Sequence, residues 1–459
     1  MDTSLVHART GRALSVAAGG TLLGMIAFTA PLGIVPSVSA SLGAGTSGTA
    51  WILSSMSLGL AIALLTSGAI GDDFGRRRVF VIGAVLLAIG TVACLVAPST
   101  LLFVVGRIVE GIGAAAVMTC GLAVISHTFP AGPSRIHATG VWGASMGAGP
   151  AIGPVLGAVL DATVGWRYAY LVIAVLALGL AVAGRFALAE SKSGRERRID
   201  VVGALLLGAG TASLLAALTE GRQGWTSPLV LVLAAAAVVL LVTFVVHQQR
   251  SAGAMVDLSL FRRRALIAAT LAAFLTGAGV IALMSFITTV LERGLAYSAV
   301  LASVVLLAWS ATSVVTALLV RHIPAWINGG IRLSGGLVLI AAGFIPLAML
   351  TSDTSGWLLV PGFIVAGLGT GLLNATLGRE AVASVPPASA GAGSGINNAS
   401  RYIGAAFGVT VVTVIAVHPG AADAAQSLIG GWNIAAMVGI GLSVVGGAVV
   451  LLLTRASRS

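Results

Sequence analysis

Long apolar stretches without charge constrain this chain more than any other feature of its sequence. A transmembrane helix needs about 20 mainly apolar residues, whereas only 8% of the 459 residues are charged, against roughly 25% in a soluble domain. The sequence predicts an all-α polytopic membrane protein without a large soluble domain. The fourteen predicted spans are residues 14–37, 48–70, 79–97, 101–125, 136–160, 168–189, 201–219, 228–247, 266–290, 299–320, 332–350, 357–376, 394–417 and 431–454.

The basic residues are distributed unevenly between the two ends of these spans. If both termini are cytoplasmic, only Arg167, Arg222 and Arg293 fall in outer loops, Arg107 and Arg401 fall within spans, and the other 20 are cytoplasmic. Cytoplasmic loops carry such an excess of arginine and lysine. We therefore predict a multi-pass protein of the cell (plasma) inner membrane with both termini cytoplasmic. The net charge of +11 then reflects orientation, and no nucleic-acid partner is expected.

One strongly polar stretch, residues 190–200, separates the first six spans from the rest. Two spans follow it, and a second basic segment over residues 256–264 precedes the last six. We expect residues 1–190 to form an N-terminal six-helix half and residues 265–459 to form a C-terminal six-helix half. Residues 191–264 would supply a linker, two extra helices and a cytoplasmic loop.

The run Gly68–Arg78 is the first strongly charged segment and lies between two spans. Glycine permits a sharp turn and a close approach of two helix ends. Asp72 can accept hydrogen bonds from the free N–H groups at the start of a neighbouring helix, and Arg76 marks the cytoplasmic side. The residues alone leave two interpretations open: a positive stop between two spans, or a functional loop.

Arg107 and Glu110 lie within the fourth predicted span. Residues three apart share a helix face and can pair, and charges inside a span are costly and usually face a bundle interior or a wet cavity. The pair is a candidate for proton coupling. The alternative is a structural ion pair near the outer end of the helix.

The fifth predicted span contains glycine and proline in a regular order. Gly149, Gly153 and Gly157 recur every four residues and form a bare stripe that another helix can approach closely. Pro150 and Pro154 each remove a backbone hydrogen bond and bend the helix. Ordinary close packing between membrane helices is the alternative to a specific transport motif.

The spacing of the Gly68–Arg78 run resembles the loop between helices two and three of the major facilitator superfamily. That loop runs Gly, three residues, Asp, basic, any residue, Gly, basic, basic, and Asp73 stands where a basic residue is usual. Arg107 fits a second family motif, with Glu110 where glutamine is usual. The resemblance implies the major-facilitator fold with a conformational-switch loop, whose matching residues are Gly68, Asp72, Gly75, Arg76 and Arg77.

The glycine and proline order of the fifth span is similar to a motif that the superfamily's antiporters carry there and its symporters generally lack. The extra pair of spans and residues 386–401 resemble the 14-spanning drug:proton antiporter family. This resemblance covers essentially the whole chain. It implies two six-helix halves plus two extra central helices, and an antiporter-motif helix that contains Gly149, Pro150, Gly153, Pro154 and Gly157.

Helix one departs from the family pattern. The family commonly has an aspartate nine residues before a proline and an asparagine four before it, but Ala27 and Leu32 occupy these positions before Pro36. A proton or cation therefore has no acid to bind in helix one. Glu110 becomes the candidate acid that exchanges a proton, since burial favours its neutral form and Arg107 favours its charged form.

Several polar residues lie near the inner ends of the twelfth and thirteenth predicted spans. They are open to two interpretations, because they could line an inner vestibule or could cap helices and lie at solvated loop ends. We expect the second for most of them, which are Asn374, Glu380, Asn397, Asn398 and Arg401.

The leading functional hypothesis is a proton-driven exporter of small hydrophobic or amphipathic molecules, such as drugs, antibiotics or metabolites, working by alternating access. The alternatives are an uncoupled facilitator or importer of a small metabolite, and a non-transporting lipid-binding membrane protein. An enzyme is not expected, since the sequence has no metalloprotease motif, phosphate loop or nucleophile setting. We expect a monomer that contacts a small-molecule substrate, protons and membrane lipids, without a cofactor or metal.

Overall fold

The computed structural model describes residues 3–192, 200–221, 224–251, 254, 257–324, 326–416 and 423–455. All regular elements within these residues are helical. In this described part of the chain, fourteen helical stretches are long and apolar enough to cross a membrane, and each overlaps one of the fourteen predicted spans. Arg222 and parts of the predicted linker and of the second basic segment lie outside the described residues.

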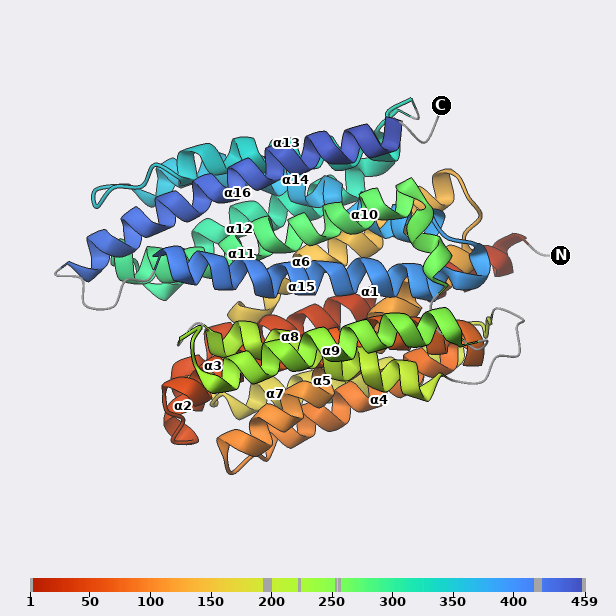
Figure 1. Cartoon of the computed structure of the whole chain (residues 1–459), viewed down its shortest axis with the longest axis horizontal. Coiled ribbons are helices and arrows are strands. Elements are labelled where there is room, and N and C mark those ends of the chain that lie inside the picture. The colour runs from red at the N-terminus through yellow and green to blue at the C-terminus, as the bar shows by residue number, and fades with distance from the viewer. Residues whose placement is uncertain are drawn as a thin grey trace.

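The N-terminal helices lie mostly in the lower part of Figure 1, in red to yellow-green. Most of them run along the long axis of the molecule. Their bounds are α1 (Thr3–Thr29), the 3-10 turn η1 (Ala30–Gly33), α2 (Val35–Ser41), α3 (Thr46–Phe74), α4 (Arg76–Leu95), α5 (Thr100–Thr128), α6 (Pro133–Thr163), α7 (Arg167–Ala187), α8 (Val201–Gly221) and α9 (Pro228–Arg250).

The C-terminal helices lie in the upper part of the same view, in green to blue. The ninth predicted span is interrupted by the π-helical turns η3 and η4, which its hydropathy did not indicate. The bounds are η2 (Leu258–Arg262), α10 (Arg264–Leu275), η3 (Thr276–Ile281), α11 (Ala282–Thr289), η4 (Val290–Gly294), α12 (Ala299–Leu319), η5 (Val320–His322), α13 (Gly329–Leu347), α14 (Gly356–Ala383), η6 (Pro387–Ser389), α15 (Ala390–Ala416) and α16 (Ala424–Arg455).

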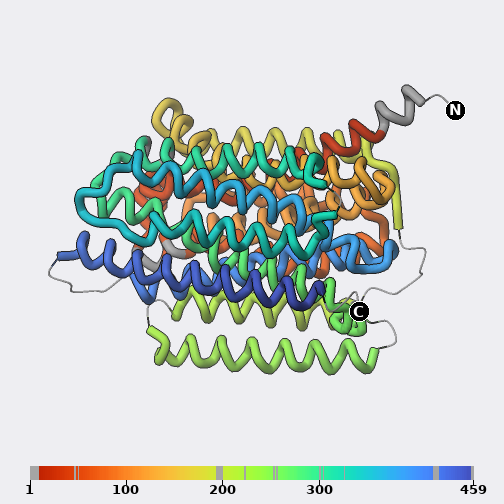
Figure 2. Tube along the Cα trace, turned by 90° about the horizontal axis from the view of Figure 1, so that it is seen from above, coloured from red at the N-terminus to blue at the C-terminus, as the bar shows by residue number. Residues whose placement is uncertain are grey.

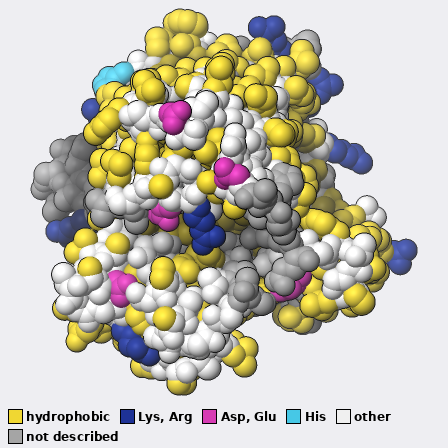
Figure 3. All heavy atoms as spheres, turned by 90° about the vertical axis from the view of Figure 1, so that its left-hand side faces the viewer, with side chains coloured by type: hydrophobic (Ala, Val, Ile, Leu, Met, Phe, Trp, Pro, Cys, Tyr) yellow, Lys and Arg dark blue, Asp and Glu magenta, His cyan; other side chains and the backbone are white. Residues whose placement is uncertain are grey.

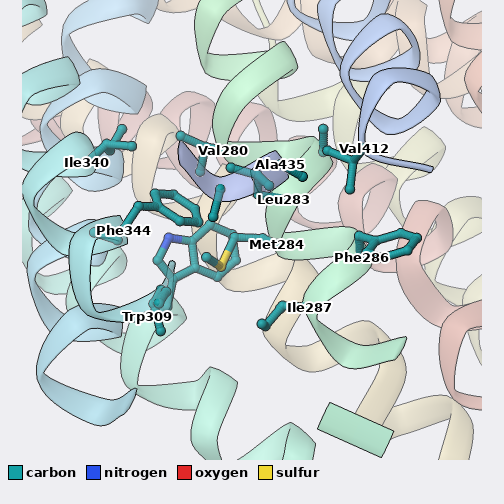
Figure 4. Packing of buried hydrophobic residues seen from close by; sticks show 14 of the residues in the cluster. Val280, Leu283, Met284, Phe286, Ile287, Trp309, Ile340, Phe344, Val412 and Ala435 are labelled. Carbon is teal, nitrogen blue, oxygen red and sulfur yellow. The ribbon is translucent and has the colours of Figure 1, made fainter. Parts of the chain in front are cut away.

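The C-terminal helices enclose a dense apolar core. Figure 4 shows the Trp309 and Phe344 rings packed beside Met284 within it. The Trp309 indole N–H donates to the Thr370 hydroxyl over 3.0 Å, so its polar atom is satisfied. Because lipid is as apolar as these side chains, close packing and such hydrogen bonds hold the helices together in a membrane.

The two groups of helices touch through α3 with α15 and through α6 with α12 and α14. Small residues permit these contacts. A Cβ added at Gly143 of α6 would lie 2.7 Å from the Ala375 nitrogen, and one at Gly395 of α15 would lie 2.6 Å from the Leu64 oxygen. Because the backbones touch directly, neither contact could form with larger side chains at these positions.

Helices α8 and α9 are central in the sequence but lie at one edge of the molecule, in light green in Figure 2. Helix α8 packs on α3 and α15, one from each group. The Thr211 hydroxyl donates to the Ala61 oxygen over 3.4 Å, and the Thr410 hydroxyl donates to the Leu218 oxygen over 3.1 Å. The extra pair therefore covers the seam between α3 and α15.

Asp200 joins the start of α8 to the end of α9. Its carboxylate accepts the Gly203 N–H over 2.8 Å at the start of α8, and it contacts His247 Nε2 at 2.8 Å and Gln248 Nε2 at 2.6 Å on α9. Partial burial raises the pKa of Asp200, but these hydrogen bonds outweigh it and hold the pKa below its usual value. The carboxylate therefore stays ionised at neutral pH.

Figure 3 views the end of the molecule away from the labelled termini. This face is mainly hydrophobic or uncharged, with isolated acidic and basic side chains. Arg167 begins α7, donates to the Leu95 and Ala97 oxygens over 3.2 and 3.3 Å, and lies 4.4 Å from the Trp166 ring. The Arg167 guanidinium thus makes a cation–π contact with a residue type that is enriched at membrane interfaces.

Candidate functional site

Gly75 alone separates α3 from α4. Its φ of 116° is a conformation that L side chains rarely adopt, and an added Cβ would lie 2.5 Å from Glu190 Oε1. The turn in the run Gly68–Arg78 is therefore tighter than the interval of residues 71–78 between the two predicted spans. The first seven residues of the run continue α3, and Arg76 already begins α4.

Asp72 forms the centre of a link between the two groups of helices. It is 4% exposed, and its Oδ1 accepts from Arg76 Nε at 2.9 Å and Nη2 at 2.7 Å. Oδ1 also accepts the Gly391 N–H and Oδ2 accepts the Ala392 N–H, each at 3.0 Å. These donors begin α15, so the predicted bond from Asp72 to a neighbouring helix N-terminus is confirmed.

Two further contacts bring α3 and the start of α15 together. Arg76 Nη2 donates to the Pro387 oxygen over 3.0 Å. A Cβ added at Gly68 would overlap the Gly391 oxygen, and one added at Gly391 would overlap the Gly68 oxygen. The backbones touch, so glycine at both positions is required for Asp72 to reach the helix terminus.

Glu190 is a member of this site that sequence reasoning did not assign. Its Oε1 accepts the Arg77 backbone N–H over 3.1 Å, and its Oε2 lies 3.6 Å from the Nε atoms of Arg77 and Arg78. Arg77 is thus tied to the segment after α7. No local pattern reveals this contact, because its partners are more than 100 residues apart in the chain.

Arg107 and Glu110 pair within α5, as their spacing predicts. Arg107 Nη1 lies 2.7 Å from Glu110 Oε2, and both side chains are fully buried. Arg107 Nη1 also donates to the Ala27 oxygen over 2.7 Å and Nη2 donates to the Phe28 oxygen over 3.1 Å. The arginine therefore joins α5 to α1 as well as to Glu110.

The break in α1 explains why Arg107 binds there. Helix α1 ends at Thr29 and continues as the 3-10 turn η1. Pro31 has no N–H, so the Ala27 carbonyl lacks its helical donor four residues ahead. Arg107 supplies a donor, and its positive charge suits the negative end of the helix dipole.

Glu110 is only half satisfied by hydrogen bonds. Its Oε2 binds Arg107, whereas its Oε1 is buried without a partner among the described residues. The α4 backbone lies against it, since a Cβ added at Gly90 would lie 3.0 Å from Glu110 Cγ. A buried carboxylate with one unsatisfied oxygen can accept a proton there without breaking an existing bond.

The glycine stripe of α6 packs against α1 and η1. A Cβ added at Gly149 or Gly153 would overlap Met25 Cβ or Thr29 Oγ1 respectively, and one at Gly157 would lie 2.7 Å from the Ala30 oxygen. The stripe therefore meets the broken end of α1 that Arg107 caps. Pro150 and Pro154 lie within one continuous helix.

We expect Gly153→Leu to abolish transport, because the leucine would have to push α1 away from α6. Overpacking of this kind costs about 1–3 kcal/mol, and more where backbone must move. Gly179→Leu is the matched control, since no atom lies within 4 Å of an added Cβ there. Transport and yield of folded protein in vesicles would be compared. Near-normal transport by Gly153→Leu would show that the stripe tolerates separation from α1.

The expectation of solvated loop ends was wrong for four of the late polar residues. Asn374 is 5% exposed, Asn397 is 1%, Asn398 is 0% and Arg401 is 2%. All four lie inside the predicted spans, Asn374 in α14 and the other three in α15, and the packing of neighbouring helices buries them there. Sequence reasoning missed them because burial depends on the packing of distant helices.

Comparisons with known proteins agree with this architecture. The sequence model of the Major Facilitator Superfamily matches residues 17–409. The chain belongs to that superfamily. It is 34% identical over 421 residues to the "Probable actinorhodin transporter" of Streptomyces coelicolor, covering 88% of this chain and 72% of that protein. It is 32% identical over 382 residues to "Multidrug resistance protein Stp" of Mycobacterium tuberculosis, with coverages of 82% and 70%.

A solved structure has the same fold. The crystal structure of the human organic anion transporter MFSD10 superposes with a TM-score of 0.69, covering 95% of this chain and 99% of that one. The two sequences are only 17% identical, so this likeness shows the fold alone. The link at Asp72, the pair at Glu110 and the stripe on α6 thus lie within the fold of this superfamily.

Proposed function

We propose that this chain is a proton-driven exporter of small hydrophobic or amphipathic molecules that works by alternating access. The names of its relatives, which refer to an actinorhodin transporter and to multidrug resistance, support export of drug-like compounds. Residues 1–190 and 265–459 would move as two halves, with the α8–α9 pair against their seam.

The link at Asp72 is the observation that carries the proposal. It joins α3 to the first N–H groups of α15 by hydrogen bonds to a buried charge, each worth about 1.5–3 kcal/mol. These bonds would hold the two halves together near the α3–α4 turn. A few strong and reversible bonds are suited to a gate, because one state keeps them and the other gives them up.

Glu110 would couple this change to a proton. Burial favours its neutral form and Arg107 favours its charged form, so a small movement of α1 or α5 can change which form is stable. Arg107 keeps two backbone acceptors at the end of α1 when Glu110 takes up a proton. The arginine therefore keeps hydrogen-bond acceptors when Glu110 is neutral, which lowers the free-energy cost of protonating Glu110 in a buried site.

Both termini would be cytoplasmic in the inner membrane. We expect a cysteine at Thr354, in the exposed turn before α14, to react with a membrane-impermeant maleimide in intact cells. A cysteine at Lys192, after α7, should react only after permeabilisation. The native Cys94 and Cys120 are buried and should not interfere. Labelling of the Lys192 position in intact cells would overturn this orientation.

Transport into everted membrane vesicles tests the proposal directly. Vesicles with this protein should accumulate fluorescent amphipathic compounds when the lumen is acidified, and a protonophore should release them. A panel with neutral, monoanionic and monocationic members avoids assuming a substrate. Vesicles from cells without the protein are the control.

The uncoupled facilitator is a second candidate, favoured by the absence of an acid at the family position in helix one, where Ala27 stands. It predicts equilibration of the same compounds at equal rates with or without a pH gradient. Such a result would reject proton coupling while keeping transport.

A further inference from the structure

Arg401 differs from the other buried arginines of the described chain. It is 2% exposed in the middle of α15, and its Nε and Nη2 groups are buried without a hydrogen-bond partner among the described residues. Arg76 and Arg107 pair with carboxylates, and Arg332 donates to backbone oxygens, for example that of Ile327 over 2.8 Å. A buried charge without a partner is costly, and an anion bound at Arg401 would offset this cost by accepting hydrogen bonds from its free N–H groups.

The polar residues beside Arg401 share its side of α15. Asn398 precedes it by three residues and Asn397 by four, which places them on one helix face. The Oδ1 atoms of both are buried without a partner among the described residues. The face therefore offers unsatisfied acceptors beside the unsatisfied donors of Arg401, as a site for a polar ligand group requires.

Aromatic side chains from the other half of the molecule lie beside this face. The Tyr402 ring meets the Phe28 ring of α1 edge to face, with centroids 5.8 Å apart, and its hydroxyl donates to Met25 Sδ over 3.2 Å. Thioether sulfur is a weak acceptor, so this bond is readily exchanged. Trp142 of α6 belongs to the same buried cluster as Tyr402 and Met25, and its indole N–H has no partner in the described chain.

The π-helical turn η3 lies against the backbone of Arg401. A Cβ added at Gly277 would overlap the Arg401 oxygen, so α15 and η3 touch without intervening side chains. Turns of this kind occur often at functional sites. The residues that contact Arg401 and its neighbour Tyr402 therefore come from α1 and from the irregular part of the ninth span, which belong to different halves.

We propose that Arg401 recognises an anionic oxygen of the transported molecule, so that the substrate class is amphipathic weak organic acids with an aromatic body. A guanidinium binds a carboxylate through two parallel hydrogen bonds, and Tyr402, Phe28 and Trp142 provide aromatic surface for the body. That the bound molecule is transported rests on the proposed export function. The binding site itself does not depend on it.

Binding to the purified full-length protein in lipid nanodiscs tests this site without a gradient. The probes are 1-pyrenebutyrate, which is ionised at neutral pH, and its neutral amide, which has the same aromatic body. The parent should bind the acid at least about tenfold more tightly than the amide. Arg401→Gln should lose that preference by weakening the acid alone. Arg332→Gln removes a buried arginine elsewhere and should keep the parent ratio.

Other outcomes would overturn the inference. An unchanged acid preference in Arg401→Gln, or an equal loss for acid and amide, would assign Arg401 a structural role. If Arg401→Gln is not recovered folded, Arg401→Lys is measured in its place. A smaller preference for the acid over the amide supports bidentate recognition, and a preference equal to that of the parent rejects it. Selective binding by a protein that accumulates nothing in vesicles would uphold this site and reject export. Export of the amide without any acid preference would reject this site alone.

Discussion

Asp72→Asn should lower proton-driven accumulation of a transported test compound at least about tenfold while the protein still reaches the membrane. Both carboxylate oxygens of Asp72 accept backbone N–H groups at the start of α15. In either orientation the asparagine amide places an NH₂ donor against one of these donors. The charge that holds Arg76 is lost as well. Loss of one hydrogen bond to a charged group costs about 1.5–3 kcal/mol, and 1.4 kcal/mol is already a factor of ten.

The measurement is initial uptake rate in everted vesicles, normalised to the amount of protein in the membrane. Asp353→Asn makes the same chemical change at an exposed carboxylate in the turn between α13 and α14, and it should transport like the parent. Arg76→Gln should resemble Asp72→Asn, because it removes the other member of the link. Unimpaired uptake by Asp72→Asn would mean that the charged run only sets topology.

Glu110→Gln should abolish accumulation against a gradient yet allow the compound to equilibrate across the membrane. Glutamine keeps the shape and an oxygen that can accept from Arg107, but it cannot titrate. Only the step that takes up and releases a proton is removed. The ratio of lumenal to external compound should therefore fall to about one in the presence of a pH gradient, whereas efflux down a concentration gradient continues.

Two further variants sharpen this test. Glu220→Gln changes a carboxylate near the C-terminal end of α8 that accepts from the Trp51 indole, and it should keep uphill transport. Arg107→Ala should be worse than Glu110→Gln, because it leaves a buried carboxylate unpaired and the broken end of α1 without a cap. Removing one partner of a buried pair costs about 3–5 kcal/mol. Accumulation by Glu110→Gln equal to that of the parent would place the proton site elsewhere or reject coupling.

The sequence by itself determined the membrane spans and the local pairs. Hydropathy and charge are properties of short segments, so fourteen spans follow from composition along the chain. The pairing of Arg107 with Glu110 follows from their spacing on one helix. The sequence also indicates a turn within the run Gly68–Arg78. It does not indicate the length of that turn, because hydropathy does not show that α3 continues through the charged residues to Phe74.

Only the tertiary structure decided which distant groups these residues meet. Asp72 binds amides 319 and 320 residues further along the chain, and Arg107 caps a carbonyl 80 residues earlier. The burial of Arg401 and the position of α8 over the seam depend in the same way on how whole helices pack. The local sequence of one segment does not indicate which distant segment it contacts. The energy of such contacts comes from the complementary shape and charge of helices that meet only in the folded protein.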